Sequence, residues 1–234
     1  MGAAQAAGFD ACLDQFPHRS IPQLASAAAS ALQVRPLCFD GFAILYSGAS
    51  KTPVYAVARL HARDFENARK RERGRNPFYE EARLPSALRS TLADYKARRA
   101  DGSRMDRGHV VPAGDMTTAR GFAQSFSLAN MVPQVPAMNQ GPWNRIEQDT
   151  RRYIKRASGD VYVFTGPVYE RAPEPLGPSG VWIPHAMFKL VYDATTRRSW
   201  VHLVPNEQGA KVGRPISYEA FVQRTGLQLL PEPQ

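Results

Sequence analysis

Residues 105–116 read MDRGHVVPAGDM and residues 139–147 read NQGPWNRIE, and these two stretches decide the interpretation of the chain. The first places Asp106, Arg107 and His109 within four positions, and Gly108 leaves the backbone room to present the imidazole into a cleft. Histidine ionises near neutral pH, so His109 can take a proton from water. A lone His beside an Asp is also a common packed or surface pair, so this stretch alone leaves both interpretations open.

The second stretch offers Asn139 just ahead of a predicted helix and Glu147 two turns into it. An amide oxygen is a hard neutral donor that Mg²⁺ accepts when water and phosphate oxygens complete its octahedron. Eight helical residues turn through about 800°, which is roughly 80° from a common face, and rise about 12 Å. If the helix began at Asn139, Glu147 would not bind the same ion directly. It would bond to water around the ion, or form a salt bridge to Arg151 at i+4.

The pattern of apolar residues predicts a mixed α+β domain built around a central sheet. Strand-like runs occur at 39–47, 53–60, 161–166, 187–193 and 199–205. The Gly and Ser residues between the first two runs predict a hairpin. Helices are predicted at 26–32, 84–99 and 142–158, and the proline-rich stretch 171–180 is predicted to be irregular. We expect a single domain over 38–230, preceded by an N-terminal arm over 1–37.

The charge balance points to a polyanionic partner, because 30 Lys and Arg residues against 21 Asp and Glu residues leave a net charge of +9. The run RKRERGR at 69–75 suits a surface that attracts phosphate, although an exposed helix end whose Glu72 relieves repulsion explains it equally. The sequence lacks the GxxxxGK[ST] loop of nucleotide hydrolases and the GxSxG elbow of serine esterases. Those two classes of enzyme are therefore unsupported.

The two cysteines, Cys12 and Cys38, lie in the N-terminal part of the chain, away from both motif stretches. This arrangement excludes a CxxC zinc site. A disulfide between them would tie the arm to the first strand and would favour a secreted or periplasmic location, whereas two free buried thiols are the alternative. Apolar runs are shorter than the ~18 residues that a membrane span needs, so we expect no membrane partner.

Together these motifs resemble those of the DNA/RNA non-specific endonucleases, a family that includes secreted bacterial nucleases and mitochondrial endonuclease G. The family signature is DRGH followed by NQGxWxxxE, found here at 106–109 and 139–147. Supporting pieces are SLANMVPQ (127–134), FTGPVY (164–169), IPHAMFKLVYD (183–193) and LVPN (203–206). The resemblance runs from about Phe39 to about Glu219. It implies a single-domain ββα-metal nuclease fold, in which helices flank a central antiparallel sheet.

The resemblance also assigns roles to individual residues. It makes His109 the general base that activates water, and Asn139 the only direct protein ligand of Mg²⁺, with Mn²⁺ as the alternative ion. Arg75 matches the phosphate-binding arginine of the family, although Arg71 or Arg73 would fit after a shift of the alignment by a few residues.

The remaining motif residues would support this site. Asn130 and Glu147 would orient it, Asp106 would brace the hydration shell of the ion, and Arg107 would either meet phosphate or hold the fold of the motif. The implied reaction hydrolyses DNA and RNA to 5′-phosphate and 3′-hydroxyl ends, because attack by water needs no 2′-hydroxyl.

Two other kinds of protein share part of these features. A non-catalytic nucleic-acid-binding protein would explain the charge but not Asn139 and Glu147. A nuclease delivered as an antibacterial toxin would keep the fold and would be neutralised by an acidic inhibitor or immunity protein.

Both a monomer and a homodimer fit the sequence. Contacts confined to phosphate would give little sequence preference.

Overall fold

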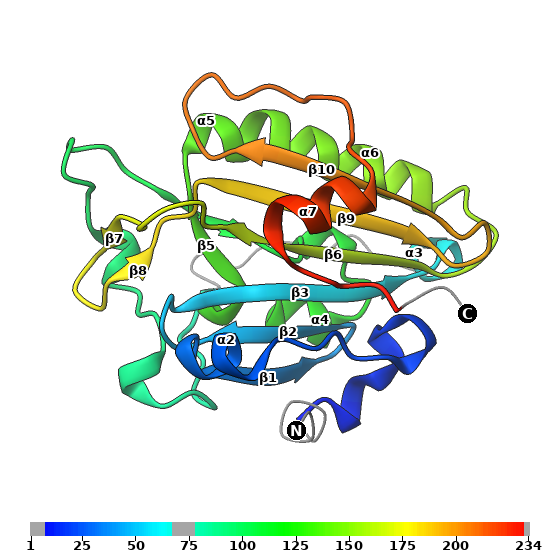
Figure 1. The fold of residues 1–234 in the computed structure, drawn as a ribbon, viewed down its shortest axis with the longest axis horizontal. Coiled ribbons are helices and arrows are strands. Elements are labelled where there is room, and N and C mark those ends of the chain that lie inside the picture. Colours follow the sequence, from blue (N-terminus) through cyan, green and yellow to red (C-terminus); the bar gives the residue numbers. More distant parts are fainter. Residues whose placement is uncertain (1–7, 67–77, 232–234) are drawn as a thin grey trace.

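The computed structural model describes residues 8–66 and 78–231. Within these ranges six strands form one antiparallel sheet in the order β1-β2-β3-β6-β9-β10, here called the main sheet (Figure 1). Its strands are β1 Val34–Phe39, β2 Phe42–Ser47, β3 Thr52–Leu60, β6 Val161–Val168, β9 Ala186–Asp193 and β10 Arg198–Pro205. The predicted strands at 53–60, 161–166, 187–193 and 199–205 and the hairpin between β2 and β3 are therefore confirmed, as is the α+β class. The run 39–47 instead contains the end of β1, a turn and β2.

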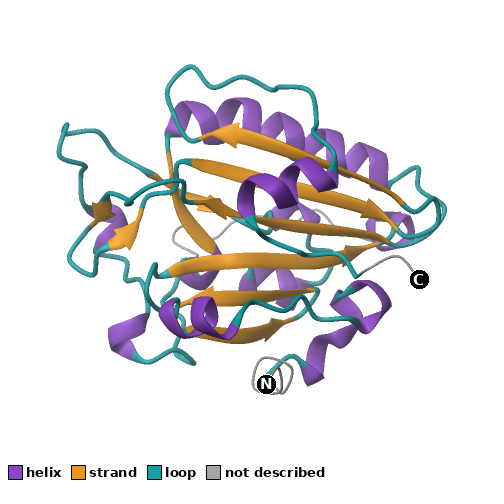
Figure 2. Cartoon of the chain, in the orientation of Figure 1, coloured by secondary structure: helices purple, strands orange, loops and turns teal. Residues whose placement is uncertain are grey.

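Two smaller antiparallel pairs and several helices surround the main sheet (Figure 2). The pairs are β4 Asp106–His109 with β5 Met131–Gln134, and β7 Pro175–Leu176 with β8 Val181–Trp182. The α-helices are α2 Ser26–Ala31, α3 Ala62–Glu66, α4 Ala119–Gln124, α5 Pro136–Met138, α6 Asn144–Ile154 and α7 Tyr218–Thr225. The shorter helical turns are η1 Asp10–Gln15, η2 Pro17–Arg19, η3 Ser86–Leu88, η4 Asp94–Lys96, η5 Ala113–Asp115, η6 Leu128–Asn130 and the π-helical η7 Asn139–Trp143. None of the described helices is long and apolar enough to cross a membrane.

The main sheet is buried on both faces. Ile44 and Met187 belong to the hydrophobic cluster shared with β5 and α6, whereas Leu45 and Phe188 belong to a second cluster shared with η1 and α7. Figure 1 accordingly shows α7 in front of the sheet and α6 behind it. Strands covered on both faces need apolar side chains at almost every position, which explains the uninterrupted apolar runs. Lys189 in the middle of β9 is a charged exception.

The described part of the N-terminal segment packs directly on the main sheet. Phe9 and Phe16 are buried in the cluster under the second face. The predicted disulfide joins Cys12 of η1 to Cys38 of β1, with their Cα atoms 5.7 Å apart. β1 itself begins at Val34, within the range that we expected for the arm.

The predicted helix over 84–99 is wrong, because only the short turns η3 and η4 form there. Polar side chains take over the backbone donors that a helix would use. The buried Asp94 accepts hydrogen bonds from the Thr91 backbone N–H at 2.7 Å and from the Ser179 N–H at 2.7 Å. The Ser90 N–H donates to the Tyr46 hydroxyl at 3.3 Å. The segment therefore follows its distant partners instead of its local helix pattern.

Candidate active site

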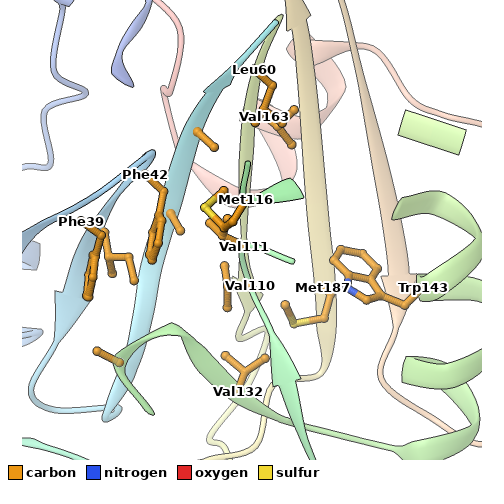
Figure 3. Packing of buried hydrophobic residues seen from close by; sticks show 14 of the residues in the cluster. Phe39, Phe42, Leu60, Val110, Val111, Met116, Val132, Trp143, Val163 and Met187 are labelled. Carbon is orange, nitrogen blue, oxygen red and sulfur yellow. The ribbon is translucent and has the colours of Figure 1, made fainter. Parts of the chain in front are cut away.

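The DRGH stretch forms the first strand of a hairpin that leads into a helix. β4 pairs with β5 over all four of its residues. The chain then runs through α5, η7 and α6. We call this combination the ββα unit. Val110, directly after β4, and Val132 of β5 lie between Phe42 of β2 and Met187 of β9 (Figure 3). The ββα unit is thus packed on one face of the main sheet.

Close packing inside the hairpin explains why residue 108 is glycine. A Cβ atom at Gly108 would lie 2.0 Å from Oε1 of Gln134, the fully buried residue that ends β5. The room that we expected beside His109 is therefore occupied by the Gln134 side chain.

Asp106 and Asn139 meet where β4 begins and the helix starts. Asn139 Nδ2 donates to Asp106 Oδ2 at 2.8 Å, and Gln140 Nε2 donates to the same oxygen at 2.9 Å. The amide nitrogen of Asn139 faces this carboxylate, so the amide oxygen of Asn139 points away from Asp106 Oδ2. The hydrogen bond nevertheless keeps the amide group of Asn139 and the carboxylate of Asp106 close together.

Asn139 lies in a π-helical turn, whereas we expected it just ahead of the helix. The Asn144 N–H reaches the Asn139 carbonyl five residues back. Pro142 lies inside this turn and has no N–H, so the regular helical bond from residue 142 to residue 138 cannot form. The helix predicted over 142–158 is confirmed by α6, but the helical segment already begins at Pro136, before the predicted start.

His109 stands among aromatic rings on the other side of β4. Its ring centroid lies 5.2 Å from that of Phe126 and 5.9 Å from that of Phe78. The Arg107 guanidinium carbon lies 4.1 Å from the centre of the Phe78 ring. Side chains alternate along a strand, so Arg107 and His109 share one side of β4 and Asp106 takes the other. The structure therefore groups Arg107 with His109, and Asp106 with Asn139.

Asn130 holds the backbone immediately beyond His109. Its side chain is fully buried. Its Oδ1 accepts from the Val111 N–H at 2.9 Å, and its Nδ2 donates to the carbonyls of Val111 and Ser125, both at 2.9 Å. The Asn130 carbonyl also accepts from the Val110 N–H at 2.9 Å. With both amide hydrogens used inside the protein, Asn130 acts on the site through the backbone.

Asn206 holds the other end of the ββα unit, and sequence reasoning gave it no role. Its Oδ1 accepts from the Val135 N–H at 2.8 Å, just before α5. Its Nδ2 donates to the carbonyls of Pro133 at 3.1 Å and Pro184 at 2.9 Å. The LVPN stretch was visible in the sequence, but its partner carbonyls lie far away along the chain.

Glu147 lies in a cluster of charges between α6 and the main sheet. Burial raises the pKa of Glu147 to about 7. Lys189 is the largest influence that lowers this pKa, and Asp115 raises it further. Arg151 and a hydrogen bond from Trp143 lower it by smaller amounts. Arg151 Nε donates to Asp115 Oδ1 at 2.7 Å. Among the described residues, the alternative ion pair between Glu147 and Arg151 does not form. Like Asn206, Lys189 was given no role in the site from the sequence.

The basic run at 69–75 lies outside the described residues. The structure therefore neither places Arg75 at the site nor distinguishes it from Arg71 and Arg73.

The oxygen donors of the ββα unit fit a hard cation such as Mg²⁺. Over 8–66 and 78–231, no group of three or more His, Cys, Asp or Glu side chains is placed to hold a metal ion. A site built on Asn139, with Asp106 beside it, would leave most coordination positions to water and phosphate, as Mg²⁺ prefers. Mn²⁺ accepts the same donors.

A main antiparallel sheet that carries the ββα unit on one face, with a histidine on the first strand and an asparagine in the helix, defines the fold of the ββα-metal nucleases. A chain in the crystal structure of the EndoG/EndoGI complex, which concerns the mechanism of EndoG inhibition, has this fold. It superposes with a TM-score of 0.70 over 88% of this chain and 92% of that chain, at 22% identity.

The profile of the DNA/RNA non-specific endonucleases matches residues 24–230, and the protein belongs to this family. It is 37% identical over 132 residues to nuclease C1 of Cunninghamella echinulata var. echinulata, covering 56% of this chain and 50% of the relative. It is 36% identical over 105 residues to human mitochondrial endonuclease G, covering 44% and 33%. It is 35% identical over 103 residues to a nuclease of Serratia marcescens, covering 43% and 38%. The matches thus span half or less of the length of these relatives.

Proposed function

We propose that the protein is a metal-dependent endonuclease that hydrolyses DNA and RNA to 5′-phosphate and 3′-hydroxyl ends. His109 is the general base, and Asn139 is the ligand of Mg²⁺ or Mn²⁺. The proposal rests above all on the ββα unit, in which the strand that carries His109 is joined to Asn139 by the bond from Asn139 to Asp106. Membership of the endonuclease family and the net charge of +9 support nucleic acid as the substrate.

Each side chain of the site has its own role in the proposed reaction. His109 takes a proton from water that attacks the phosphorus opposite the leaving 3′ oxygen, and the departing oxygen takes up a proton from a second water to become the 3′-hydroxyl end. The rings of Phe78 and Phe126 limit the orientations of the His109 imidazole. Asp106 orients the Asn139 amide by accepting from its nitrogen. Mg²⁺, held by Asn139 when bound, supplies Lewis-acid stabilisation of charge on the phosphate oxygens. Arg107 faces the same side as His109, where a cation attracts the phosphate.

The test measures cleavage of supercoiled plasmid and of RNA, with Mg²⁺ or with EDTA. We expect wild type to degrade both only with Mg²⁺. His109→Ala should lose about 10²- to 10⁴-fold in rate, which is the usual contribution of a general base. Asn139→Ala should lose metal-dependent cleavage while keeping its fold by circular dichroism. His61→Ala, beyond the end of β3, and Asn144→Ala, exposed on α6, are the matched controls and should remain active.

Either substitution could contradict its own assignment. Unchanged cleavage by His109→Ala would remove the base assignment, and unchanged metal dependence of Asn139→Ala would remove the ligand assignment. Wild type that bound nucleic acid but never cut it would be a non-catalytic binding protein.

The location and the protein partners are part of the same proposal. The disulfide of Cys12 and Cys38 supports a secreted or periplasmic location, because oxidising compartments preserve such bonds. The net charge of +9 suits an acidic inhibitor or immunity protein, and the EndoG chain of similar fold was solved with EndoGI.

A further inference from the structure

Lys189 is a buried lysine on the face of the main sheet that carries the ββα unit. Its side chain is 1% exposed. Across the neighbouring strands it is paired with Thr165 of β6 and His202 of β10. Its Nζ donates to Thr165 Oγ1 at 2.9 Å. A hydroxyl group satisfies one of the three ammonium hydrogens, but it does not balance the charge.

The arrangement of α6 identifies the counter-charge. Lys189 Nζ lies 5.2 Å from the centre of the Trp143 ring. Trp143 and Glu147 are four residues apart and therefore lie on one face of the helix, which is the face turned toward the ammonium group. The other carboxylate of the cluster, Asp115, is bound at 2.7 Å by Arg151. Among the described residues Lys189 forms no direct ion pair, so Glu147 is the carboxylate left to balance its charge from a longer distance.

We propose that Lys189 is a positioning residue of the metal site: its ammonium is the buried counter-charge that holds the Glu147 carboxylate, and with it the helix bearing Asn139, against the main sheet. This inference rests on the proposed function, in which Asn139 binds Mg²⁺. An isolated ammonium in this position would be strongly unfavourable, whereas a paired one is tolerated.

The electrostatic influences on the neighbouring groups agree with this pairing. Burial lowers the pKa of Lys189, and Glu147 is the largest influence that raises it again. The pKa of His202 is lowered by burial and then by Lys189, so this histidine tends to remain neutral. Asp115, Arg151 and Trp143 are the other groups that act on Glu147.

The first test is a double-mutant cycle of urea unfolding with EDTA present, which does not depend on nuclease activity. It is done at about pH 8, where Glu147, with a pKa of about 7, is ionised. Its variants are Lys189→Met, Glu147→Gln and the combination of the two. We expect Lys189→Met to lower the unfolding midpoint in the wild-type background. In the Glu147→Gln background the same substitution should cost much less, because it then removes an unbalanced charge. Equal costs in both backgrounds would overturn the pairing.

The second test is calorimetric titration of Mg²⁺ into each protein without substrate. We expect Lys189→Met to weaken Mg²⁺ binding about 10- to 100-fold, the usual effect of losing a residue that orients the groups around a metal. Lys155→Met, at the exposed end of α6, is the matched control and should bind like wild type. Unaltered binding by a folded Lys189→Met protein would contradict the positioning role.

The two proposals fail in different ways. If wild type neither binds Mg²⁺ nor cuts nucleic acid, the proposed function fails whatever the double-mutant cycle shows. If wild type binds and cuts, but Lys189→Met binds equally well and the cycle is additive, only the role of Lys189 is lost.

Discussion

The carboxyl group of Glu147 makes folding depend on pH. Burial raises its pKa to about 7 from an ordinary value of 4.5, even though Lys189 opposes the rise. The folded protein therefore holds this proton more tightly than the unfolded chain does. The contribution of Glu147 to the free energy of unfolding is fully present below about pH 4.5 and is lost as the pH rises through 7.

Glu147→Gln should remove this dependence. Between pH 5 and pH 8, in EDTA, wild type should lose stability more steeply than the variant, by at most about 3 kcal/mol. Urea unfolding at several pH values measures the two slopes. Glu207→Gln, an exposed carboxyl group on a loop, is the matched control and should keep the wild-type slope. Parallel curves for wild type and Glu147→Gln would disprove the interpretation.

The neighbours of Gly108 leave no room for a side chain, not even for one Cβ atom. The Cβ of Gly108→Ala would approach Gln134 Oε1 to 2.0 Å, so the variant should lose about 1–3 kcal/mol of stability through overpacking. Gln134→Ala in the same chain creates the missing space. Thermal melts should therefore show the double variant recovering part of the loss caused by Gly108→Ala. A double variant less stable than either single variant would argue against a steric cause.

Among the elements, the π-helical turn η7 gives the candidate site a backbone geometry that a regular α-helix would not provide. Pro142 prevents the bond from residue 142 to Met138, and the wider turn sets the angle between Asn139 and Glu147. Pro142→Ala restores an N–H and favours a regular helix. We expect stability equal to or above that of wild type together with weaker Mg²⁺ binding, measured by thermal melts and calorimetry. Unchanged Mg²⁺ binding would show that the π-helical turn is not needed.

Elements were predictable where local pattern and tertiary environment agree. The apolar runs of β2, β3, β6, β9 and β10 satisfy both faces of a buried sheet, so their sequences suffice to identify them. The stretch 84–99 has a helix pattern as well, but Asp94 bonds to Ser179, which is 85 residues away. Pro142 suits the first turn of a helix, and nothing local reveals that the helical segment starts before it.

For the whole molecule, the disulfide between Cys12 and Cys38 ties the N-terminal segment to the main sheet across a sequence separation of 26 residues. A crosslink over such a loop restricts the unfolded chain and should contribute about 3.5 kcal/mol. Reduction with dithiothreitol should lower the free energy of unfolding by about this amount in urea titrations. The Cys12→Ala/Cys38→Ala protein should not respond to the reductant. Equal stability of oxidised and reduced wild type would rule out this contribution.

The motif residues of the candidate site could be named from the sequence, but the residues that hold them could not. DRGH and NQG are contiguous stretches, so their joint occurrence was visible. Asn206 and Lys189 act across long separations, through carbonyl groups and a buried charge that leave no local pattern. The grouping of His109 with Arg107, apart from Asp106 and Asn139, likewise required the strand to be placed in the fold.

The position of Asn206 in the chain has a consequence for synthesis. A growing chain contains both motif stretches once residue 147 has been made, while Lys189 and Asn206 have still to be added. The backbone between β5 and α5 lacks its hydrogen bonds to Asn206 until that residue leaves the ribosome. An enzyme of this kind would thus complete its site only after Asn206 has followed both motif stretches out of the ribosome.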